Sequence, residues 1–201
     1  MPFFLSISIK VGAVSTNTGI YVAVREFSDY FKGDTTVIDT AQGLDLDGNA
    51  KWFEVSQAAV QVNRFAPMSV GAGEETGSDK PSLMPFYIGK EPDLTTGLFL
   101  ENIISLAEPS LTVDVIATRQ EAGKSGMNIM LQYTLGGVRI CNWEEDIGKL
   151  ERYWLAYRTI LRIDYLFKRD DKGKLLAREP AVTFEYNLDT PQVEMSTIAE
   201  T

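Results

Sequence analysis

The sequence has no histidine in 201 residues and only one cysteine, Cys141. Without an imidazole, the chain lacks the Ser-His or Cys-His pair of many hydrolases and the commonest protein ligand for zinc or iron. A single cysteine cannot form a disulfide within the chain, and a lone thiol suits folding in a reducing compartment. We therefore expect a protein that is not an enzyme and that holds no cofactor and no metal.

An excess of basic residues and a long apolar run are also missing. The net charge is −9, from 19 basic and 28 acidic residues, which argues against a nucleic-acid partner. No stretch approaches the roughly 20 apolar residues of a membrane span, so we expect no membrane insertion. The N-terminal MPFFLSISIK has no basic start and no cleavage site, and its only charge, Lys10, comes at the end. We expect a strand there, and export without a cleaved signal peptide if the protein leaves the cell.

What the sequence does contain is alternation of apolar and polar residues with a period of two. It recurs at residues 3–10, 111–118, 127–135 and 182–188. This pattern is typical of antiparallel strands with one buried face and one wetter face.

The stretch from Glu151 to Arg169 is long enough for a helix, but its aromatic and β-branched residues favour a strand. As a strand it places seven apolar residues on one face: Tyr153, Leu155, Tyr157, Leu161, Ile163, Tyr165 and Phe167. Residues 170–173 follow as a hairpin turn.

One helix is expected, from Thr95 or Thr96 to Ala107. Asp93 or Thr95 can cap its start, and Pro109 limits its extension. Its apolar stripe at helical spacing consists of Phe99, Ile103 and Leu106, with Leu98 a turn away. The fold class is therefore mainly β: an antiparallel β-barrel or sandwich of two sheets with one short α-helix.

Two stretches without periodicity, residues 28–50 and 66–82, interrupt the strands. The second, APMSVGAGEETGSDKPS, has the composition of a long loop. Loops of this length inside a compact domain are uncommon and are often functional or ordered by a partner. The polar C-terminus contains Pro191 and is expected to fray. We expect a single domain over residues 1–190 and a flexible tail over 191–201.

Three glycine-containing motifs approach known ligand-binding loops without matching them. Residues 123–125, Gly-Lys-Ser, look like the end of a phosphate-binding loop, but Thr118 stands where its first glycine is needed. Residues 71–77 have the spacing GxGxxxG rather than GxGxxG, and no βαβ unit surrounds them. Residues 45–49 place glycine at position four of a calcium loop instead of six, with Ser56 at position twelve. Turns and loops are the favoured interpretation of all three.

Other candidate residues also have a simpler interpretation. The acidic residues 144–146 could pair carboxylates, but adjacent acids in a glycine-flanked connection favour a solvated turn. Cys141, with no histidine to activate it, is predicted to be a buried, unreactive thiol. Trp52, Trp143 and Trp154 could stack on sugars, but the apolar area of each favours the core or a subunit contact. None of these is a convincing active site.

From residue 51 to residue 190 the order of features becomes specific. The strand KWFEVSQAAVQVNRF leads to the glycine-rich loop ending at Lys80-Pro81, and SLMPFYIGK leads into the predicted helix. EPSLTVDVIATR, MNIMLQYTLGGVRI, ERYWLAYRTILRIDYLF and VTFEYNL follow. This order resembles the Hcp (haemolysin-coregulated protein) family of type VI secretion tube proteins, relatives of contractile phage tail tubes.

One motif supports the resemblance. In the family, K-x-x-D-x-S-[ST]-P opens the single helix. Here Lys90, Asp93, Thr95 and Thr96 match it, and Gly97 replaces the proline. The N-terminal part departs from the family, because residues 18–50 are longer than in a typical member and form a divergent insertion.

The resemblance implies that six copies close head to tail into a ring with a wide lumen, which uses two different surfaces of each subunit. The extended loop, residues 64–81, would reach the neighbour, and lateral contact would cover apolar positions such as Ile116 and Met130. The implied interface residues in the loop are Arg64, Phe65, Met68, Val70, Gly71, Gly73, Glu74, Glu75 and Lys80.

The predicted function is that of a structural subunit of the type VI secretion tube. Hexameric rings would assemble and stack in the cytoplasm inside a contractile sheath, carry a spike and be expelled with effectors in the lumen. Two alternatives remain open: a tail tube protein of a phage or another contractile particle, and a monomeric β-barrel module that binds a sugar or lipid with its tryptophans.

Overall fold

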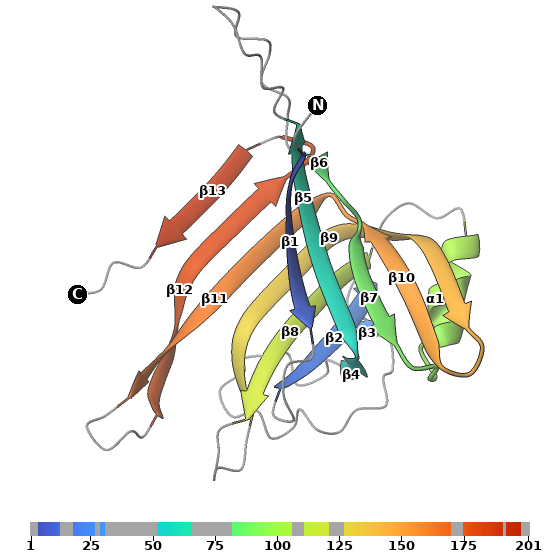
Figure 1. Cartoon of the computed structure of the whole chain (residues 1–201), viewed down its shortest axis with the longest axis horizontal. Helices are drawn as coiled ribbons and strands as arrows, with labels where there is room; N and C mark the ends of the chain where they lie inside the picture. The colour runs from blue at the N-terminus through green and yellow to red at the C-terminus, as the bar shows by residue number, and fades with distance from the viewer. Residues whose placement is uncertain are drawn as a thin grey trace, which may run out of the picture.

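The computed structural model describes most of the chain: residues 4–12, 18–26, 29–30, 52–65, 82–105, 111–120, 127–169, 175–190 and 192–197. These residues form strands and one helix (Figure 1). In chain order they are β1 (Phe4–Gly12), β2 (Thr18–Glu26), β3 (Asp29–Tyr30), β4 (Trp52–Val55), β5 (Gln57–Phe65), β6 (Ser82–Leu83), β7 (Phe86–Lys90), α1 (Thr96–Ile104), β8 (Leu111–Gln120), β9 (Met127–Asp146), β10 (Leu150–Ala156), β11 (Thr159–Arg169), β12 (Leu175–Asn187) and β13 (Gln192–Thr197). The prediction of a mainly antiparallel β fold with one short helix is confirmed.

The strands follow one hydrogen-bonded path, β1-β5-β7-β10-β9-β11-β12-β13, with β2 and β8 joined to β9 as a branch. The 20-residue β9 takes part in both layers of the fold. It pairs with β11 as far as Gly136 and with β10 from Arg139 onward. Gly137, at φ +59°, lies between these two pairings. Only glycine adopts this left-handed backbone conformation without a steric cost. The corner at which β9 passes from one layer to the other therefore favours glycine.

The main core fills the space between the layers. It collects inward residues from β2, β4, β5 and β7 to β12, and Phe99 of α1. The Phe99 ring meets Phe53 edge-on at 5.8 Å and lies 4.6 Å from the Tyr153 ring, centre to centre. Phe99 thus connects the helix to strands of both layers, β4 and β10.

The stretch from Glu151 to Arg169 is extended, as expected, but it is not one strand. Tyr157 and Arg158 separate β10 from β11. Both strands pair with β9, but the second partner of β10 is β7 and that of β11 is β12. The break also interrupts the alternation of buried and less buried residues. Tyr153, Leu155 and Tyr157 are buried at every second position, but the next buried residue is Ile160. The single continuous face predicted from Tyr153 to Phe167 is therefore wrong beyond Tyr157.

The helix starts where expected but ends at Ile104, before the predicted end at Ala107. The backbone of Ser105 is extended, at φ −68° and ψ 137°, which ends the helical hydrogen bonding. Within the predicted stripe, Phe99 is fully buried and Ile103 is half-buried, whereas Leu106 lies outside the described residues. Among the described residues, no helix is long and apolar enough to cross a membrane.

A second apolar cluster lies on the opposite face of the β2–β8–β9 layer. We call it the outer cluster; its members are Tyr21, Ala23, Trp52, Ile116 and Ile129. Ile116 is fully buried within the single chain. The expectation that a neighbouring subunit would have to cover it is therefore wrong. Met130, the other position named for such cover, is half-buried.

Candidate functional site

Four residues of the predicted motif form the centre of a buried polar cluster at the start of α1. We call it the helix-opening cluster; it contains Lys90, Asp93, Thr95, Thr96 and Glu151. Lys90 ends β7, Glu151 lies opposite it on β10, and the other three lie on the turn into the helix. The Lys90 side chain is 0% exposed and that of Glu151 is 1% exposed.

The Lys90 ammonium group is surrounded by acceptors. Its Nζ lies 2.7 Å from Asp93 Oδ1 and 2.8 Å from Glu151 Oε2. It also donates to Thr96 Oγ1 and to the carbonyl oxygen of Glu91, both at 3.1 Å. A buried ammonium group is tolerated only when it is paired and hydrogen-bonded in this way.

The two threonines complete the hydrogen bonding. The Thr96 hydroxyl donates to Glu151 Oε2 at 2.9 Å and accepts from Lys90 Nζ and from the backbone N–H of Asp93. The backbone N–H and the hydroxyl of Thr95 both donate to Asp93 Oδ1. Of the two caps considered, Asp93 accepts hydrogen bonds from the turn, whereas the side chain of Thr95 makes no capping bond.

Glu151 and Tyr153 are members of this network that the sequence pattern did not indicate. The Tyr153 hydroxyl donates to Glu151 Oε2 at 2.9 Å. Burial, followed by the hydrogen bond to Glu151, raises the pKa of Tyr153. A signal was available, because residues two apart on a strand share a face and Tyr153 was placed on the buried face. The arrangement holds the helix against β7 and β10, and its buried lysine is fully engaged as a donor.

Most of the predicted loop interface falls outside the described residues. This holds for Met68, Val70, Gly71, Gly73, Glu74, Glu75 and Lys80. Arg64 and Phe65 end strand β5, where their backbones pair with Leu5 and Phe4 of β1. Residues 66–81 leave from β5 and return to β6, which pairs with β5.

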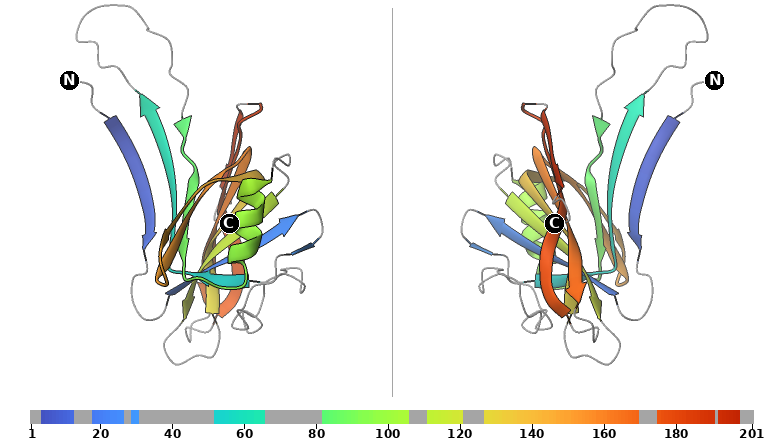
Figure 2. Two further views of the ribbon diagram at one scale, coloured as in Figure 1. Left: turned by 90° about the vertical axis from the view of Figure 1, so that its right-hand side faces the viewer. Right: turned by 90° about the vertical axis from the view of Figure 1, so that its left-hand side faces the viewer.

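A groove opens between the two ends of the strand path. β1 pairs only with β5 and β13 only with β12, so among the described strands neither outer edge has a partner. Figure 2 shows the β1–β5 pair leaning away from β12 and β13. We call the space between them the seam groove; it measures about 360 Å³. Its apolar wall consists of Val60, Val62, Leu83, Ile160, Val182, Phe184 and Met195.

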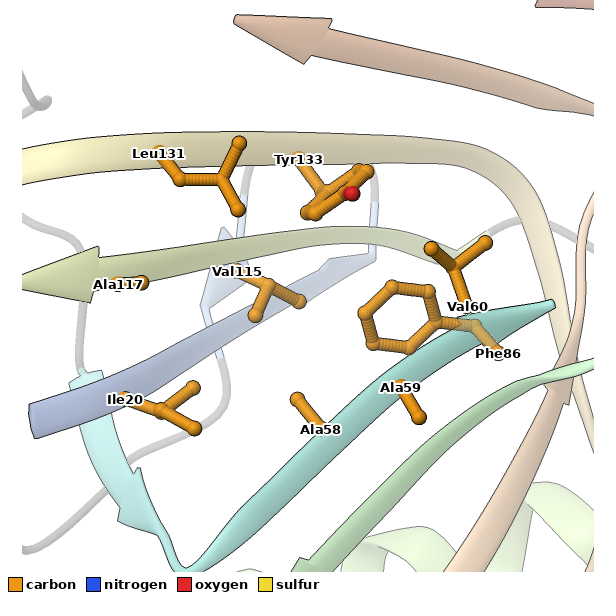
Figure 3. A pocket seen from close by; sticks show the side chains of 9 residues that line it. All are labelled: Ile20, Ala58, Ala59, Val60, Phe86, Val115, Ala117, Leu131 and Tyr133. Atoms are coloured by element: carbon orange, nitrogen blue, oxygen red, sulfur yellow. The ribbon is translucent and has the colours of Figure 1, made fainter. Parts of the chain in front are cut away.

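Three polar residues lie at the base of the seam groove. Arg162 donates two hydrogen bonds, each 2.8 Å long, to the carboxylate of Asp164, and its guanidinium group lies over the Tyr133 ring. The Tyr133 hydroxyl is buried with no hydrogen-bond partner, and burial raises its pKa. Beneath the groove is a cavity of about 10 Å³. Val60 and Tyr133 line both the groove and this cavity, and apart from Tyr133 the cavity lining is apolar (Figure 3). It is too small and too apolar to hold a ligand.

The other candidate residues form no catalytic site. Cys141 is exposed, and its thiol contacts the carbonyl oxygen of Trp154, so the prediction of a buried thiol is wrong. Its strand position explains this, because the neighbouring Ile140 takes the inward face. Residues 144–146 are exposed but end strand β9, before the turn at 147–149, so the predicted turn is one segment too early. Asp146 pairs with Arg152 of β10 at 2.8 Å. No group of metal-ligating side chains occurs among the described residues.

The tryptophans do not line a common surface. Trp52 belongs to the outer cluster, and Trp143 packs against the main core. Trp154 lies against Tyr87, with 5.4 Å between ring centres. The seam groove contains none of the three. Residues 45–49, 71–77 and 123–125 lie outside the described residues.

Comparison with known proteins connects this fold to a secretion system. The family model "Type VI secretion system effector, Hcp" matches residues 39–165, more than half of the chain. No curated protein matches the sequence. Among solved structures, a type six secretion system protein is similar with a TM-score of 0.59 and 15% identity, over 87% of this chain and 99% of the other. An Hcp protein matches with a TM-score of 0.54 and 13% identity, over 90% and 99%. Hcp1 from Salmonella typhimurium matches with a TM-score of 0.52 and 12% identity, over 88% and 99%.

At these identities the structural likeness supports the fold, and the family model supports the membership. The chain belongs to the Hcp family of type VI secretion system proteins.

Proposed function

We propose that this chain is a structural subunit of the type VI secretion tube and that six copies close into a ring. The rings would stack inside a contractile sheath behind a spike, and would be expelled with effectors in their lumen. The mechanism is assembly and mechanical delivery, with no bond chemistry. Family membership supports the secretion role.

The observation that carries the ring proposal is the open strand path. β1 and β13 are different strands, so their unpaired edges are two different surfaces, which is what a head-to-tail ring requires. The unpaired backbone groups of an edge strand can form hydrogen bonds with another chain, and a closed ring would cover these edges. The seam groove adds apolar area between the edges: Val62 is 38% exposed and Met195 is 67% exposed.

The net negative charge of the subunits affects how rings stack. Each subunit carries a net charge of −9, so a ring of six repels another ring unless complementary patches meet or salt screens the charges. We therefore expect stacked rings to become more abundant as ionic strength rises, with single rings dominating in dilute buffer.

The first test is the mass of the purified protein in solution, measured by light scattering, with negative-stain images of the same peak. A mass near six subunits with ring images supports the proposal. The variant Met195→Lys places a charge at the seam edge and is expected to reduce the ring fraction. Ile147→Lys is the matched control, because Ile147 is 90% exposed on the β9–β10 turn, away from the seam groove.

The extended loop provides a second test. We propose that residues 64–81 reach onto the neighbouring subunit, because they start and end at the paired strands β5 and β6 next to the open edge. Deleting residues 70–79 is then expected to leave a folded subunit with weakened ring assembly. Rings like those of the wild type from this deletion would contradict the role of the loop.

A clean monomer at high protein concentration would overturn the ring proposal. It would favour a ligand-binding barrel, for which the seam groove offers an apolar wall and an unpartnered Tyr133 hydroxyl. Because no tryptophan lines the groove, a ligand there would have to be detected by calorimetry, since tryptophan fluorescence would not report it directly. Neighbouring genes for a sheath and an ATPase, in contrast to capsid genes, would separate the secretion role from that of a phage tail tube.

A further inference from the structure

Two glutamates lie opposite each other in the last strand pair, beside the open edge of β13. Glu185 of β12 is the register partner of Glu194 of β13, and both side chains are exposed. Like charges directly opposite each other on neighbouring strands destabilise the pair. Within the part of the chain that the structure describes, no cation forms an ion pair with either carboxylate. A cation supplied by another strand at the open edge would therefore be favourable next to Glu194.

The next residue of β13 lies on the other face of the strand. Met195 lines the seam groove beside Phe184, its register partner on β12, and is 67% exposed. Ser196 is again on the face of Glu194, because successive residues of a strand alternate between faces. A strand that paired with the open edge of β13 would thus match it best with an apolar residue opposite Met195 and a cation opposite Glu194.

The sequence of β1 has this pattern, and β1 forms the other open edge. Ser8, Ile9 and Lys10 follow one another in this strand, and Lys10 is its only charged residue. In the β1–β5 register, Ile9 is the partner of Val60, which lines the seam groove. Positions 8 and 10 therefore belong to the face of β1 away from the groove, as Glu194 does on β13.

The strand directions allow these two edges to pair between copies. Every neighbouring pair on the path from β1 to β13 is antiparallel. The path has eight strands, so β13 runs opposite to β1. Within one chain the two strands do not pair, and Figure 1 and Figure 2 both show them apart. The β1 strand of a second copy in the same orientation would be antiparallel to β13, and the same contact could repeat from copy to copy.

We propose that β1 of one copy pairs with β13 of the next in the antiparallel register that places Lys10 opposite Glu194. Ile9 then lies opposite Met195, and residues 7–12 cover the whole of β13. A shift by one residue would exchange the two faces, and a shift by two would leave Glu194 without a cation. The inference rests on the proposed ring and names the strand contact, its register and the ion pair that hold neighbouring subunits together.

A pair of cysteines tests the register. In a Cys141→Ser background, which removes the only native cysteine, Lys10→Cys is combined with Glu194→Cys. Their Cα atoms would be about 4.5–5.5 Å apart, so oxidation is expected to link subunits into a ladder on a non-reducing denaturing gel. Ser8→Cys with Glu194→Cys is the control. It is two positions out of register, with Cα atoms about 8 Å apart, and is expected to link at least tenfold less.

Exchanging charges tests the ion pair. Glu194→Lys would face Lys10, and it is expected to raise the protein concentration at which rings form by about fivefold or more. Lys10→Glu combined with Glu194→Lys restores opposite charges and is expected to return this concentration toward the wild-type value. Glu101→Lys makes the same charge change at an exposed position of α1, away from both edges, and is expected to have no effect.

Three outcomes would overturn the inference while leaving the ring intact. Rings whose cysteines link only within single chains would show that β13 closes on its own β1. Equal linking in both registers, or none in either, would show that another contact joins the subunits. Rings of Glu194→Lys that form like those of the wild type would exclude the ion pair. The absence of rings from the unmodified protein would instead overturn the proposed function, and this inference with it.

Discussion

Replacing Lys90 by methionine tests the helix-opening cluster directly. Methionine has nearly the shape of the lysine stem but supplies no charge and no donor. Glu151, 1% exposed, and Asp93, 18% exposed, would then face each other with no cation between them. Removing one partner of a buried ion pair costs about 3–5 kcal/mol. For a chain of this size each kcal/mol lowers Tm by about 2–4 °C, so the expected loss is roughly 6–20 °C.

The opposite change is expected to be milder. Glu151→Gln removes one negative charge but leaves Lys90 paired with Asp93 at 2.7 Å, so a neutral pair remains. The loss of one charge-assisted hydrogen bond costs about 1.5–3 kcal/mol. In the double variant the uncompensated Glu151 charge is absent, and we expect a smaller loss than the sum of the two single losses, with a coupling of about 0.5–3 kcal/mol.

The assay is urea and thermal unfolding followed by tryptophan fluorescence, with calorimetry to check that a single transition occurs. Arg152→Met is the matched control, because the Arg152–Asp146 pair has the same 2.8 Å geometry on the surface and is expected to contribute nothing measurable. Unfolding of Lys90→Met within about 1 kcal/mol of the wild type, or strict additivity of the two changes, would refute the reasoning.

Three further predictions concern single positions. Burial raises the pKa of Asp114 above its usual value, although its hydrogen bond to Thr134 and its ion pair with Arg25 act in the opposite direction. The charged carboxylate is therefore disfavoured in the folded state, and Asp114→Asn should raise Tm at pH 7. In a pH series of thermal melts this gain should vanish near pH 3, where the carboxyl group is protonated in both states. A side chain at Gly97 would meet nothing within 4 Å, so Gly97→Ala should stabilise the helix by about 0.5–1 kcal/mol in urea unfolding, and a loss of stability would contradict this. The pKa of Tyr153 is raised in the folded state, so above about pH 10 the tyrosine ionises first in the unfolded chain, and the fold loses stability as the pH rises further. Tm should therefore fall steeply above pH 10, and less steeply in Tyr153→Phe.

Alternation of apolar residues predicted the fold class because one face of each strand packs on the main core. The stretch around 111–118 shows both the success and the limit of this argument. Val113 and Val115 face the main core as the pattern requires. Ile116 breaks the alternation, since a period of two provides for only one buried face, and the family resemblance implied that a neighbouring subunit covers it. The outer cluster buries the second face as well, and nothing in the spacing of single residues indicates that.

The strand break at Tyr157 and the role of Glu151 were hidden for a related reason. Aromatic residues continue on both sides of Tyr157, so composition alone gives no sign that the chain changes sheet there. Glu151 is charged and was assigned no role at the start of the predicted strand, although it shares the face of Tyr153. Its burial depends on Lys90, 61 positions earlier in the sequence, and such a pairing is decided by sheet register. The motif from Lys90 to Thr96, in contrast, could be located because its members are close in sequence.

The position of β2 has a consequence for how the chain folds during synthesis. This strand lies between β4 and β8 in the finished sheet, and Thr18 pairs with Arg119. At translation speeds of about 5–20 residues per second, β8 leaves the ribosome roughly 4–17 s after β2. During that delay the apolar side chains of β2 have no completed sheet to join, and pairings over such sequence distances form slowly. A strand that is paired on both edges in the finished sheet is thus among the first to be made and among the last to gain both partners.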